Sequence, residues 1–356
     1  MTQDQGLAAW LTLCLTPGLG AATIRRLLNE FGLPEKILAA DRHALSSVAG
    51  SEAATALTTG VASAAVERAL QWAAQPQHHV VTLADAAYPR LLLEIQDPPP
   101  VLYAAGNPDL LNRAALAIVG SRNGTAQGIR NAEAFAKAFS DGGLTIVSGL
   151  ALGIDAAAHR GGLAGSGSTI AVLGTGIDVI YPRSNASLFV EIAEWGLLLS
   201  EYPVGTPSAA HNFPRRNRLI SGLARGCLVV EAAVGSGSLI TARLATEQGR
   251  EVFAIPGSIH SPLSKGCHAL IKQGAKLVDT AEDVMSELGN WRYASTLPAR
   301  APAIGLLQHM GFDPVDIDAL CARAGLPAEA VAAELLRLEL DGLVATLPGG
   351  RYQRLN

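Results

Sequence analysis

The sequence predicts an α/β protein built around a mostly parallel sheet. Short apolar runs bounded by Gly, Ser or Pro recur through the middle of the chain, and helical patterns separate them. Residues 1–75 show helical patterns alone, and residues 304–356 show three helical patterns and then a hairpin. Short buried strands that alternate with helices indicate βαβ units, whose strands run parallel. We therefore predict domains at 1–75, 76–290 and 304–356, with a linker at 291–303.

The composition is that of an ordinary globular protein with a slightly acidic balance. Apolar residues make up 49% of the 356 residues, and the formal net charge is −4. The four cysteines form no CxxC pair, so we expect neither a zinc site nor a disulfide framework. The opening MTQDQ lacks the basic residues of a signal peptide, and no apolar run is long enough to cross a membrane. We expect a cytoplasmic protein without a membrane partner.

Residues 1–75 begin with two helical segments joined by a tight turn. The segments are Leu7–Leu15 and Ala21–Phe31, and Pro17-Gly18-Leu19-Gly20 lies between them. This arrangement resembles a SAM-like or helix–hairpin–helix domain, in which N–H groups at a helix N-terminus meet a phosphate. Residues 45–50 resemble a degenerate second copy of the turn. A helical bundle that does no more than pack explains the same pattern.

Strand-like runs follow from residue 80 onward, and they predict a Rossmann-like sheet. The runs are Val80–Leu83, Leu116–Val119, Leu144–Val147, Thr169–Leu173, Leu197–Ser200, Cys227–Glu231, Glu251–Ile255 and Lys276–Val278. Helical patterns such as Ala126–Ser140 and Leu239–Gln248 stand between them. Such sheets bind their ligands beyond the carboxyl ends of the strands.

The last part of the chain predicts a winged helix. Three helical segments, Ile304–Met310, Val315–Ala324 and Ala328–Asp341, precede a hairpin formed by Leu343–Thr346 and Arg351–Leu355. The third helix would be the recognition helix, but it carries four acidic residues and one arginine. We expect this domain to contact protein, or to bind DNA weakly.

Glycine-rich loops follow most of the predicted strands. They are Gly120-Ser121-Arg122, Ser148-Gly149 through Asp155, Gly174-Thr175-Gly176 through Asp178, Gly235-Ser236-Gly237-Ser238 and Pro256-Gly257-Ser258. Glycine lets backbone N–H groups approach an anion closely, and the helix that follows adds a favourable partial charge. Several such loops at one edge of a sheet predict a site for a polyanion or a large nucleotide.

The loops do not fit the common nucleotide-cofactor or catalytic motifs. The Gly174 loop lacks the third glycine of a dinucleotide fingerprint, and no P-loop is present. No serine-hydrolase elbow, metalloprotease helix or paired carboxylate appears at a telling spacing. We therefore expect no cofactor, no metal and no catalytic residue.

Basic residues are concentrated in three stretches that contain no acid. These stretches hold Arg113, Arg122 and Arg130, then His211, Arg215, Arg216, Arg218 and Arg225, and last Lys265, Lys272 and Lys276. Arginine forks match phosphate geometry. We expect the three stretches to meet at the loop edge of the sheet. Phe213 is either a core residue or a platform on which an unpaired base stacks.

Several of these motifs together resemble the DNA-processing protein A family, also called DprA or Smf. The resemblance lies in Ala117–Arg122, Ser148–His159, Phe213–Leu223 and Gly237–Ala242, with support from Tyr88-Pro89 and Asp97–Pro99. It covers roughly residues 80–290, and the flanking domains match the family architecture less specifically.

The resemblance implies a non-enzymatic protein that binds single-stranded DNA in natural transformation, loads the recombinase RecA and forms a homodimer. Its Gly-Ser-Arg and Phe-Pro-x-Arg-Asn-Arg motifs place Arg122, Arg216, Asn217 and Arg218 at the DNA pocket, with Arg183 as a neighbour. Together with the loops, the expected phosphate-binding set is Gly120, Ser121, Arg122, Ser148, Gly149, Gly174, Gly176, Arg183, Asn212, Phe213, Arg215, Arg216, Asn217, Arg218, Ser221, Gly237, Ser238 and Lys265.

Two other readings stay open. The Gly235–Ser238 loop resembles the ribose-phosphate loop of nucleoside-monophosphate phosphoribohydrolases, but the glutamate that the following helix offers, Glu247, comes one or two turns too late. The other reading is a structural scaffold whose loops bind nothing.

Overall fold

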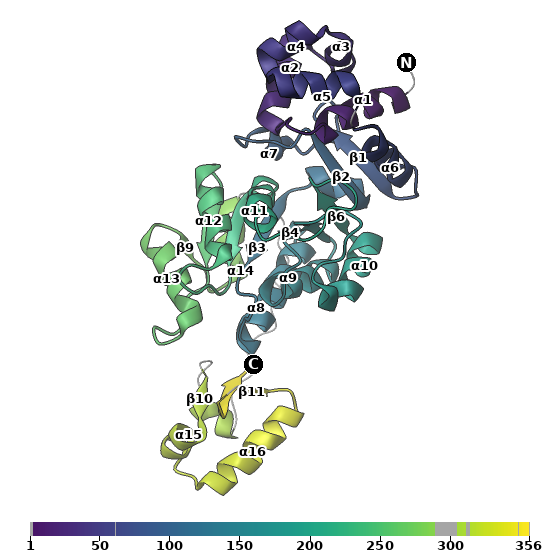
Figure 1. The fold of residues 1–356 in the computed structure, drawn as a ribbon. Coiled ribbons are helices and arrows are strands. Elements are labelled where there is room, and N and C mark those ends of the chain that lie inside the picture. Colours follow the sequence, from purple (N-terminus) through teal and green to yellow (C-terminus); the bar gives the residue numbers. More distant parts are fainter. Residues whose placement is uncertain (1–2, 61, 289–304, 311–313, 348, 356) are drawn as a thin grey trace.

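A nine-stranded sheet forms the centre of the computed structural model, which describes residues 3–60, 62–288, 305–310, 314–347 and 349–355 (Figure 1). The strand order is β1-β2-β6-β5-β4-β3-β7-β8-β9. The strands are β1 His78–Thr82, β2 Val101–Gly106, β3 Ala115–Val119, β4 Thr145–Ser148, β5 Thr169–Val172, β6 Leu197–Ser200, β7 Gly226–Val229, β8 Glu251–Ala254 and β9 Lys276–Leu277. The linker predicted at 291–303 lies outside the described residues.

The predicted mostly parallel sheet is confirmed. All neighbours from β6 to β9 pair in parallel, whereas β2 pairs antiparallel with both β1 and β6. Strand β2 was not predicted, because the prolines at 98–100 make this stretch resemble a loop. All six residues of β2 are buried, and the strand joins β1 to the parallel part of the sheet.

Helices cover both faces of the sheet, so side chains that alternate along a strand enter different cores. Leu116 and Ile118 of β3 pack with one set of helices, and Ala117 and Val119 pack with the other. The first set is α8 Ala126–Asp141, α9 Ile154–Leu163 and α14 Ala281–Leu288. The second set is α7 Arg90–Leu93, α11 Asn212–Gly222, α12 Gly237–Glu247 and α13 Lys265–Lys272. The remaining central helix, α10 Ala186–Trp195, packs near β2 and β6.

Within residues 3–60 and 62–77, six helices precede the sheet. They are α1 Gln3–Leu15, α2 Ala21–Phe31, α3 Pro34–Ala39, α4 Arg42–Ala49, α5 Ser51–Thr59 and α6 Ser63–Ala73. Leu13, Leu27 and Leu45 belong to a core that these helices form among themselves. Trp10 of α1 and Trp72 of α6 instead share a core with Tyr103 of β2. The boundary predicted at residue 75 stays a prediction, and it runs through this shared core.

The C-terminal part is a winged helix, as predicted. Its elements are a 3-10 turn at Gly305–His309, β10 Val315–Asp316, α15 Ile317–Ala324, α16 Ala328–Leu340, β11 Val344–Leu347 and β12 Arg351–Arg354, with the strand order β10-β12-β11. Two details differ from the prediction. The first helical segment is a 3-10 turn within the described residues, and Val315–Asp316 is a short strand because it pairs with β12.

The winged helix contacts the central sheet layer through α8. The backbone N–H of Gln127 donates to Gln353 Oε1 over 3.3 Å, and Arg130 Nη1 donates to the carbonyl of Gly342 over 3.1 Å. The N-terminal helices and α15–α16 lie at opposite ends of the molecule (Figure 1). Among the described residues, no helix combines the length and the apolar character needed to span a bilayer.

Close packing of α8 on α9 leads to a stability prediction. A Cβ at Gly161 would lie 2.2 Å from the backbone oxygen of Glu133, so Gly161→Ala forces the two helices apart. We expect the free energy of unfolding to fall by about 1–3 kcal/mol, as for other overpacked cores. Urea denaturation followed by circular dichroism measures this change.

Gly6→Ala is the matched control, because a Cβ there meets only the flexible end of Glu35 at 3.3 Å. Alanine inside a helix is favoured over glycine by about 0.5–1 kcal/mol, so this variant is expected to be neutral or stabilised. Equal losses in both variants would contradict the packing argument.

Candidate functional site

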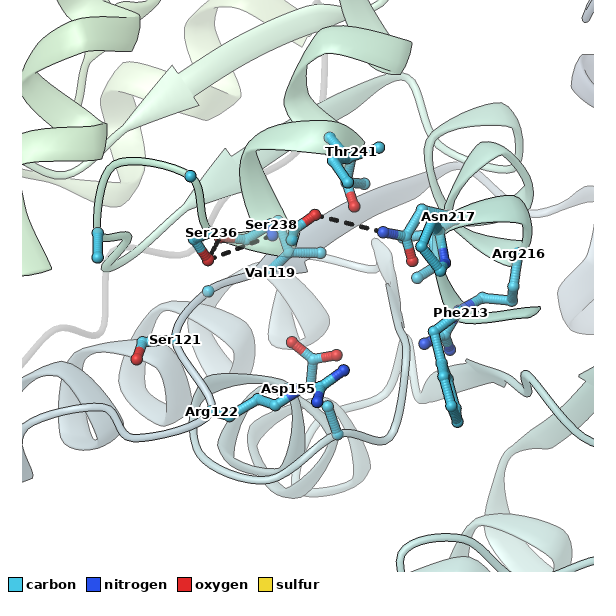
Figure 2. A pocket seen from close by; sticks show the side chains of 18 of the residues that line it. Val119, Ser121, Arg122, Asp155, Phe213, Arg216, Asn217, Ser236, Ser238 and Thr241 are labelled. Carbon is cyan, nitrogen blue, oxygen red and sulfur yellow. Dashed lines mark hydrogen bonds between the residues drawn. The ribbon is translucent and has the colours of Figure 1, made fainter. Parts of the chain in front are cut away.

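A cavity of about 870 Å³ opens at the carboxyl ends of β3 and β7 (Figure 2). We call it the carboxyl-edge cavity. Three segments form most of its wall: the loop Gly120–Asn123, the first turns of α11, and the loop Gly235–Ser238 that leads into α12. Since β3 and β7 are parallel neighbours, the loops that follow them necessarily meet at one edge of the sheet.

Phe213 brings an aromatic ring and a cation together at the mouth of this cavity. Its ring centroid lies 5.2 Å from that of Tyr181 and 6.0 Å from the guanidinium carbon of Arg122. A Cβ at Gly174 would lie 2.6 Å from the Phe213 ring, so the glycine makes room for it. Phe213 is therefore a half-buried wall of the cavity and not a residue of the sheet core.

Arg216 is a buried cation that lines the cavity floor. Its side chain is 4% exposed, and Nη1 donates to the carbonyl of Gly149 over 2.8 Å and to the carbonyl of Val172. Its Nε is buried and has no protein partner among the described residues. Burial lowers the pKa of Arg216 to about 10, an effect that the nearby Asp155 opposes, and Arg216 therefore stays charged at neutral pH.

Asp155 holds the loops around Arg216 in place. The backbone N–H of Gly149 donates to Asp155 Oδ2 over 3.2 Å, and the N–H groups of Gly120 and Ala151 also act on this carboxylate. Burial raises the pKa of Asp155, while the positive charge of Arg216 and these N–H groups counteract the rise. One carboxylate thus accepts from the loops after β3 and β4, and its negative charge also favours the charged form of Arg216.

Several N–H groups of the glycine loops after β3, β4 and β5 bond within the protein. The N–H of Ser121 donates to the carbonyl of Glu231 over 2.7 Å, and that of Gly176 donates to Thr206 over 2.9 Å. The N–H of Leu150 donates to His159 over 3.2 Å. Glycine is needed there for close packing instead: a Cβ at Gly120 would lie 2.7 Å from Ile154. Positive charge in the cavity comes mainly from the side chains of Arg122 and Arg216.

The N-terminus of α12 forms the opposite wall. Ser236 is its N-cap: the hydroxyl accepts a weak 3.4 Å hydrogen bond from the N–H of Ser238 and lies 2.8 Å from the Ser238 hydroxyl. Asn217 Nδ2 donates to the carbonyl of Gly237 over 3.3 Å, which joins α11 to this loop (Figure 2). The N-terminal residues of α12 line the cavity, and the first turn carries no acidic residue that would neutralise the partial positive charge of this helix end.

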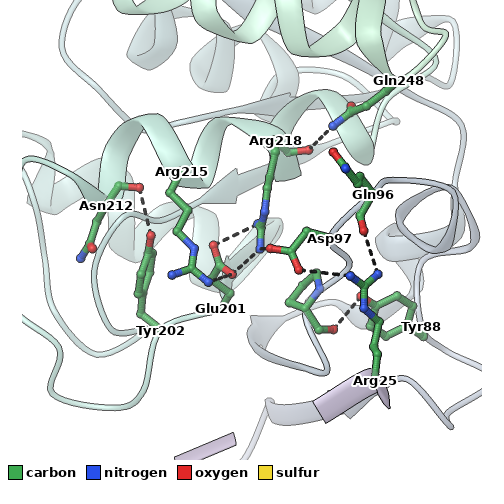
Figure 3. A network of polar contacts seen from close by, with 11 residues as sticks. Arg25, Tyr88, Gln96, Asp97, Glu201, Tyr202, Asn212, Arg215, Arg218 and Gln248 are labelled. Carbon is green, nitrogen blue, oxygen red and sulfur yellow. Dashed lines mark hydrogen bonds and ion pairs between the residues drawn. The ribbon is translucent and has the colours of Figure 1, made fainter. Parts of the chain in front are cut away.

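Arg218 lies away from the cavity, in a separate ionic network (Figure 3). Its two Nη atoms donate to the two carboxylate oxygens of Glu201 over 3.0 and 2.7 Å. Asp97 lies 3.5 Å from Arg218, and Arg25 of the N-terminal helices lies 3.6 Å from Asp97. Arg215 stands 3.9 Å from Glu201 on the same side of α11. This network joins α11 to β6 and to the N-terminal helices.

The expected phosphate-binding residues fall into three groups. The lining of the carboxyl-edge cavity includes Gly120, Ser121, Arg122, Phe213, Arg216, Asn217, Gly237 and Ser238. Buried and outside the lining are Ser148, Gly149, Gly174, Gly176, Asn212 and Ser221. Outside the lining are Arg183, Arg215, Arg218 and Lys265. Tyr181 also lines the cavity and was not expected there, although an aromatic residue three positions after the Gly174 loop was a usable signal.

The expected meeting of all three basic stretches at this edge is wrong. Arg113 and Arg225 precede β3 and β7, so they lie at the amino ends of these strands. Arg130 binds the winged helix, and Lys276 pairs with Glu287. The distribution of charges along the sequence does not show whether a residue lies at the amino or the carboxyl end of a strand.

Comparisons with known proteins identify both the central and the C-terminal parts of the chain. Residues 79–289 match the model of the family described as DNA recombination-mediator protein A, and residues 293–350 match that of the DprA winged helix domain. The chain is 44% identical to Protein Smf of Escherichia coli over 303 residues, which cover 82% of this chain and 81% of that protein. It is 50% identical to DNA processing protein DprA of Streptococcus pneumoniae over 206 residues, or 58% and 73% of the two chains.

Two solved structures are similar in fold. The crystal structure of DNA processing protein A from Streptococcus pneumoniae has a TM-score of 0.70 at 38% identity and covers 81% of this chain and 98% of that chain. The structure of DNA processing protein A from Helicobacter pylori has a TM-score of 0.55 at 30% identity and covers 60% and 95%. The latter is described as showing a single-stranded DNA binding mode of that protein.

The network around Glu201 predicts unequal effects of two arginine substitutions on α11. The side chains of Glu201 and Arg218 are 6% and 12% exposed, so Arg218→Ala leaves a buried carboxylate without its main partner. We expect a loss of about 3 kcal/mol in the free energy of unfolding. Arg215 is 55% exposed, and Arg215→Ala is expected to cost less than about 1 kcal/mol. Chemical denaturation of both variants checks this difference, and equal costs would refute the role of the pair.

His159 predicts a pH dependence of stability. Its Nε2 accepts from the N–H of Leu150, and Nδ1 lies 2.7 Å from Thr169 Oγ1, whose own proton goes to Ile146. Burial disfavours the charged ring and lowers the pKa of His159 from 6.5 to about 3. The unfolded chain takes up this proton near pH 6.5, whereas the folded protein takes it up only near pH 3. The free energy of unfolding therefore keeps its full value above pH 6.5. It falls by up to about 1.4 kcal/mol per pH unit as the pH decreases from 6.5 toward 3.

Urea denaturation at pH 7 and pH 5 measures this slope. In His159→Gln the side chain does not titrate, so the variant is expected to lose less stability than the wild type between the two pH values. Parallel pH dependences in the two proteins would show that His159 is not responsible.

Proposed function

The chain belongs to the family of DNA recombination-mediator protein A, and on this basis we propose that it binds single-stranded DNA in the carboxyl-edge cavity. The observation that carries the proposal is the placement of two arginines, Arg122 and Arg216, beside the aromatic pair Phe213 and Tyr181 in one cavity. Arginine forks bind phosphate, and aromatic rings stack on unpaired bases. This combination suits a single strand, because the bases of a duplex are not available for stacking on a side chain.

The two arginines have different parts in this proposal. Arg122 is exposed at the cavity mouth, so it can follow a phosphate on the strand. Arg216 is fixed by the carbonyls of Gly149 and Val172, and it provides a positive charge that does not move. The N-terminus of α12 adds a further partial positive charge on the opposite wall. The single-stranded DNA binding described for the Helicobacter pylori protein supports the same assignment.

We further propose that the chain acts as a recombination mediator. The family resemblance implies that it protects incoming strands in natural transformation, helps to load RecA and forms a homodimer in the cytoplasm. These partners follow from the family and not from the geometry of the cavity. The acidic surface of α16 supports a protein partner for the winged helix and not a DNA duplex.

A hydrolase of the phosphoribohydrolase type has less support from the positions of the carboxylates. Glu247 lies at the last turn of α12, pairs with Arg243 over 3.5 Å and faces a different cavity. Asp155 is the one carboxylate among the described residues that line the carboxyl-edge cavity, and it is engaged by backbone N–H groups. Release of free base from a panel of nucleotides would support the hydrolase instead.

Two substitutions separate phosphate binding from base stacking. Arg122→Ala is expected to weaken binding of every single strand about tenfold, and to reduce the slope of log K against log salt by about 0.7, because one phosphate contact is lost. Phe213→Leu is expected to weaken binding by about fivefold or more through lost stacking, with the salt slope unchanged. Fluorescence anisotropy at several salt concentrations measures both quantities.

Arg160→Ala is the control for the loss of one positive charge, because Arg160 lies on α9 and outside the cavity. It is expected to retain the affinity and the slope of the wild type. An Arg122→Ala variant with wild-type affinity and slope would count decisively against the proposed cavity.

A further inference from the structure

A second basic cavity, of about 550 Å³, lies at the opposite edge of the sheet. We call it the amino-edge cavity. It is lined by Ala86, Arg90, Leu91, Leu111, Asn112, Arg113, Ala114, Leu223 and Arg225. Three of these residues are arginines, and two of them, Arg113 and Arg225, belong to the acid-free stretches but do not line the carboxyl-edge cavity.

The sheet itself brings these arginines together. Arg225 directly precedes β7, and its backbone N–H donates to the carbonyl of Ala115, the first residue of β3, over 2.9 Å. Arg113 lies two residues before β3, so it stands beside Arg225 at the amino ends of two paired strands. The arrangement is thus a consequence of the same strand pairing that builds the carboxyl-edge cavity at the other end.

Arg90 is placed by a separate set of hydrogen bonds. Its backbone N–H donates to Asn112 Oδ1 over 3.1 Å, and Asn112 Nδ2 donates to the carbonyl of Ala87 over 3.0 Å. These bonds fix the start of α7 against the segment that precedes β3. Arg90 therefore reaches the cavity from a third direction.

The charge of the amino-edge cavity is not balanced within its lining. No carboxylate occurs among the described residues that line it, and all three arginines are exposed. Two carboxylates from the adjoining segments have partners: Glu94 lies 2.8 Å from Arg250, and Asp85 accepts the N–H of Thr82 over 2.7 Å. In a chain with a net charge of −4, Arg90 and Arg113 place positive charge at one cavity, whose lining Arg225 also joins.

The floor of the cavity narrows the class of ligand. Leu91, Leu111 and Leu223 line it, so an apolar surface lies between the arginines. A bare inorganic anion makes no use of such a surface. A nucleotide unit of a strand combines a phosphate for an arginine with a flat base for an apolar floor, and it matches both features.

We propose that the amino-edge cavity binds the phosphates of a further segment of single-stranded DNA, continuous with the segment held in the carboxyl-edge cavity. This inference rests on the proposed function. The two cavities lie at opposite ends of β3, which has five residues and a length of about 16 Å. A strand must therefore pass around the molecule to reach both, and only a long strand fills the second cavity while it occupies the first.

The test compares strand lengths on the full chain. We expect Arg90→Ala/Arg113→Ala to bind an oligodeoxythymidine of about 6 nucleotides as the wild type does, and one of about 30 nucleotides at least fivefold more weakly. The salt slope for the long strand is expected to decrease by about 1.4, since each phosphate contact to a single strand contributes about 0.7. Arg68→Ala/Arg323→Ala removes two exposed arginines elsewhere and is expected to match the wild type on both strands.

Other results would overturn the assignment in distinguishable ways. If the wild type binds both strands and the Arg90/Arg113 variant retains the long-strand affinity and slope, the second segment is refuted and the proposed function stands. Calorimetry with triphosphate is a second measurement. If the wild type binds triphosphate and the Arg90/Arg113 variant does not, while both bind the long strand equally well, the cavity binds a free anion and the second DNA segment is refuted. Equal losses on the short and long strands would also refute a separate site. Absence of wild-type binding to either strand would refute both proposals.

Discussion

The buried carboxylate of Asp155 is the constraint on which the carboxyl-edge cavity depends. It lies where the loops after β3 and β4 meet α9, and the N–H of Gly149 and the charge of Arg216 are directed at it. A buried cation is costly without a compensating charge and hydrogen-bond acceptors. Asp155 provides the charge, and the carbonyls of Gly149 and Val172 provide the acceptors. The cavity floor can therefore keep a fixed positive charge beneath a surface that is otherwise mildly acidic.

The arginines of α11 serve two purposes on two sides of one helix. Arg216 faces the cavity, whereas Arg215 and Arg218 face Glu201. A long-range consequence follows, because the Glu201 network extends through Asp97 to Arg25 on α2. Helix α11 thus contacts the N-terminal helices and also forms part of the cavity wall, although Arg25 is far in the sequence from the residues that line the cavity.

Much of this architecture could be predicted from the sequence, because the short apolar runs and their glycine boundaries depend on local patterns. The loop after β3, the start of α11 and the start of α12 were expected at the site, and all three line the carboxyl-edge cavity. The side on which each arginine lies was not expected. Residues three apart on a helix share a face, so Arg215 and Arg218 lie on one side of α11 and Arg216 lies on another. Which of these sides faces Glu201 depends on the tertiary structure and could not be predicted from the sequence. Arg113 and Arg225 were misplaced because charge counting ignores strand direction.

The core shared by α1, α6 and the sheet affects how the chain folds during synthesis. Trp10 and Leu11 pack in the same cluster as Ile192 and Leu198, which the ribosome adds nearly two hundred residues later. At about 5–20 residues per second, the apolar face of α1 waits roughly 10–40 s for this partner surface. During that time α1 can pack on α6 and on the other N-terminal helices, but it lacks the part of its native contacts that α10 and β6 provide.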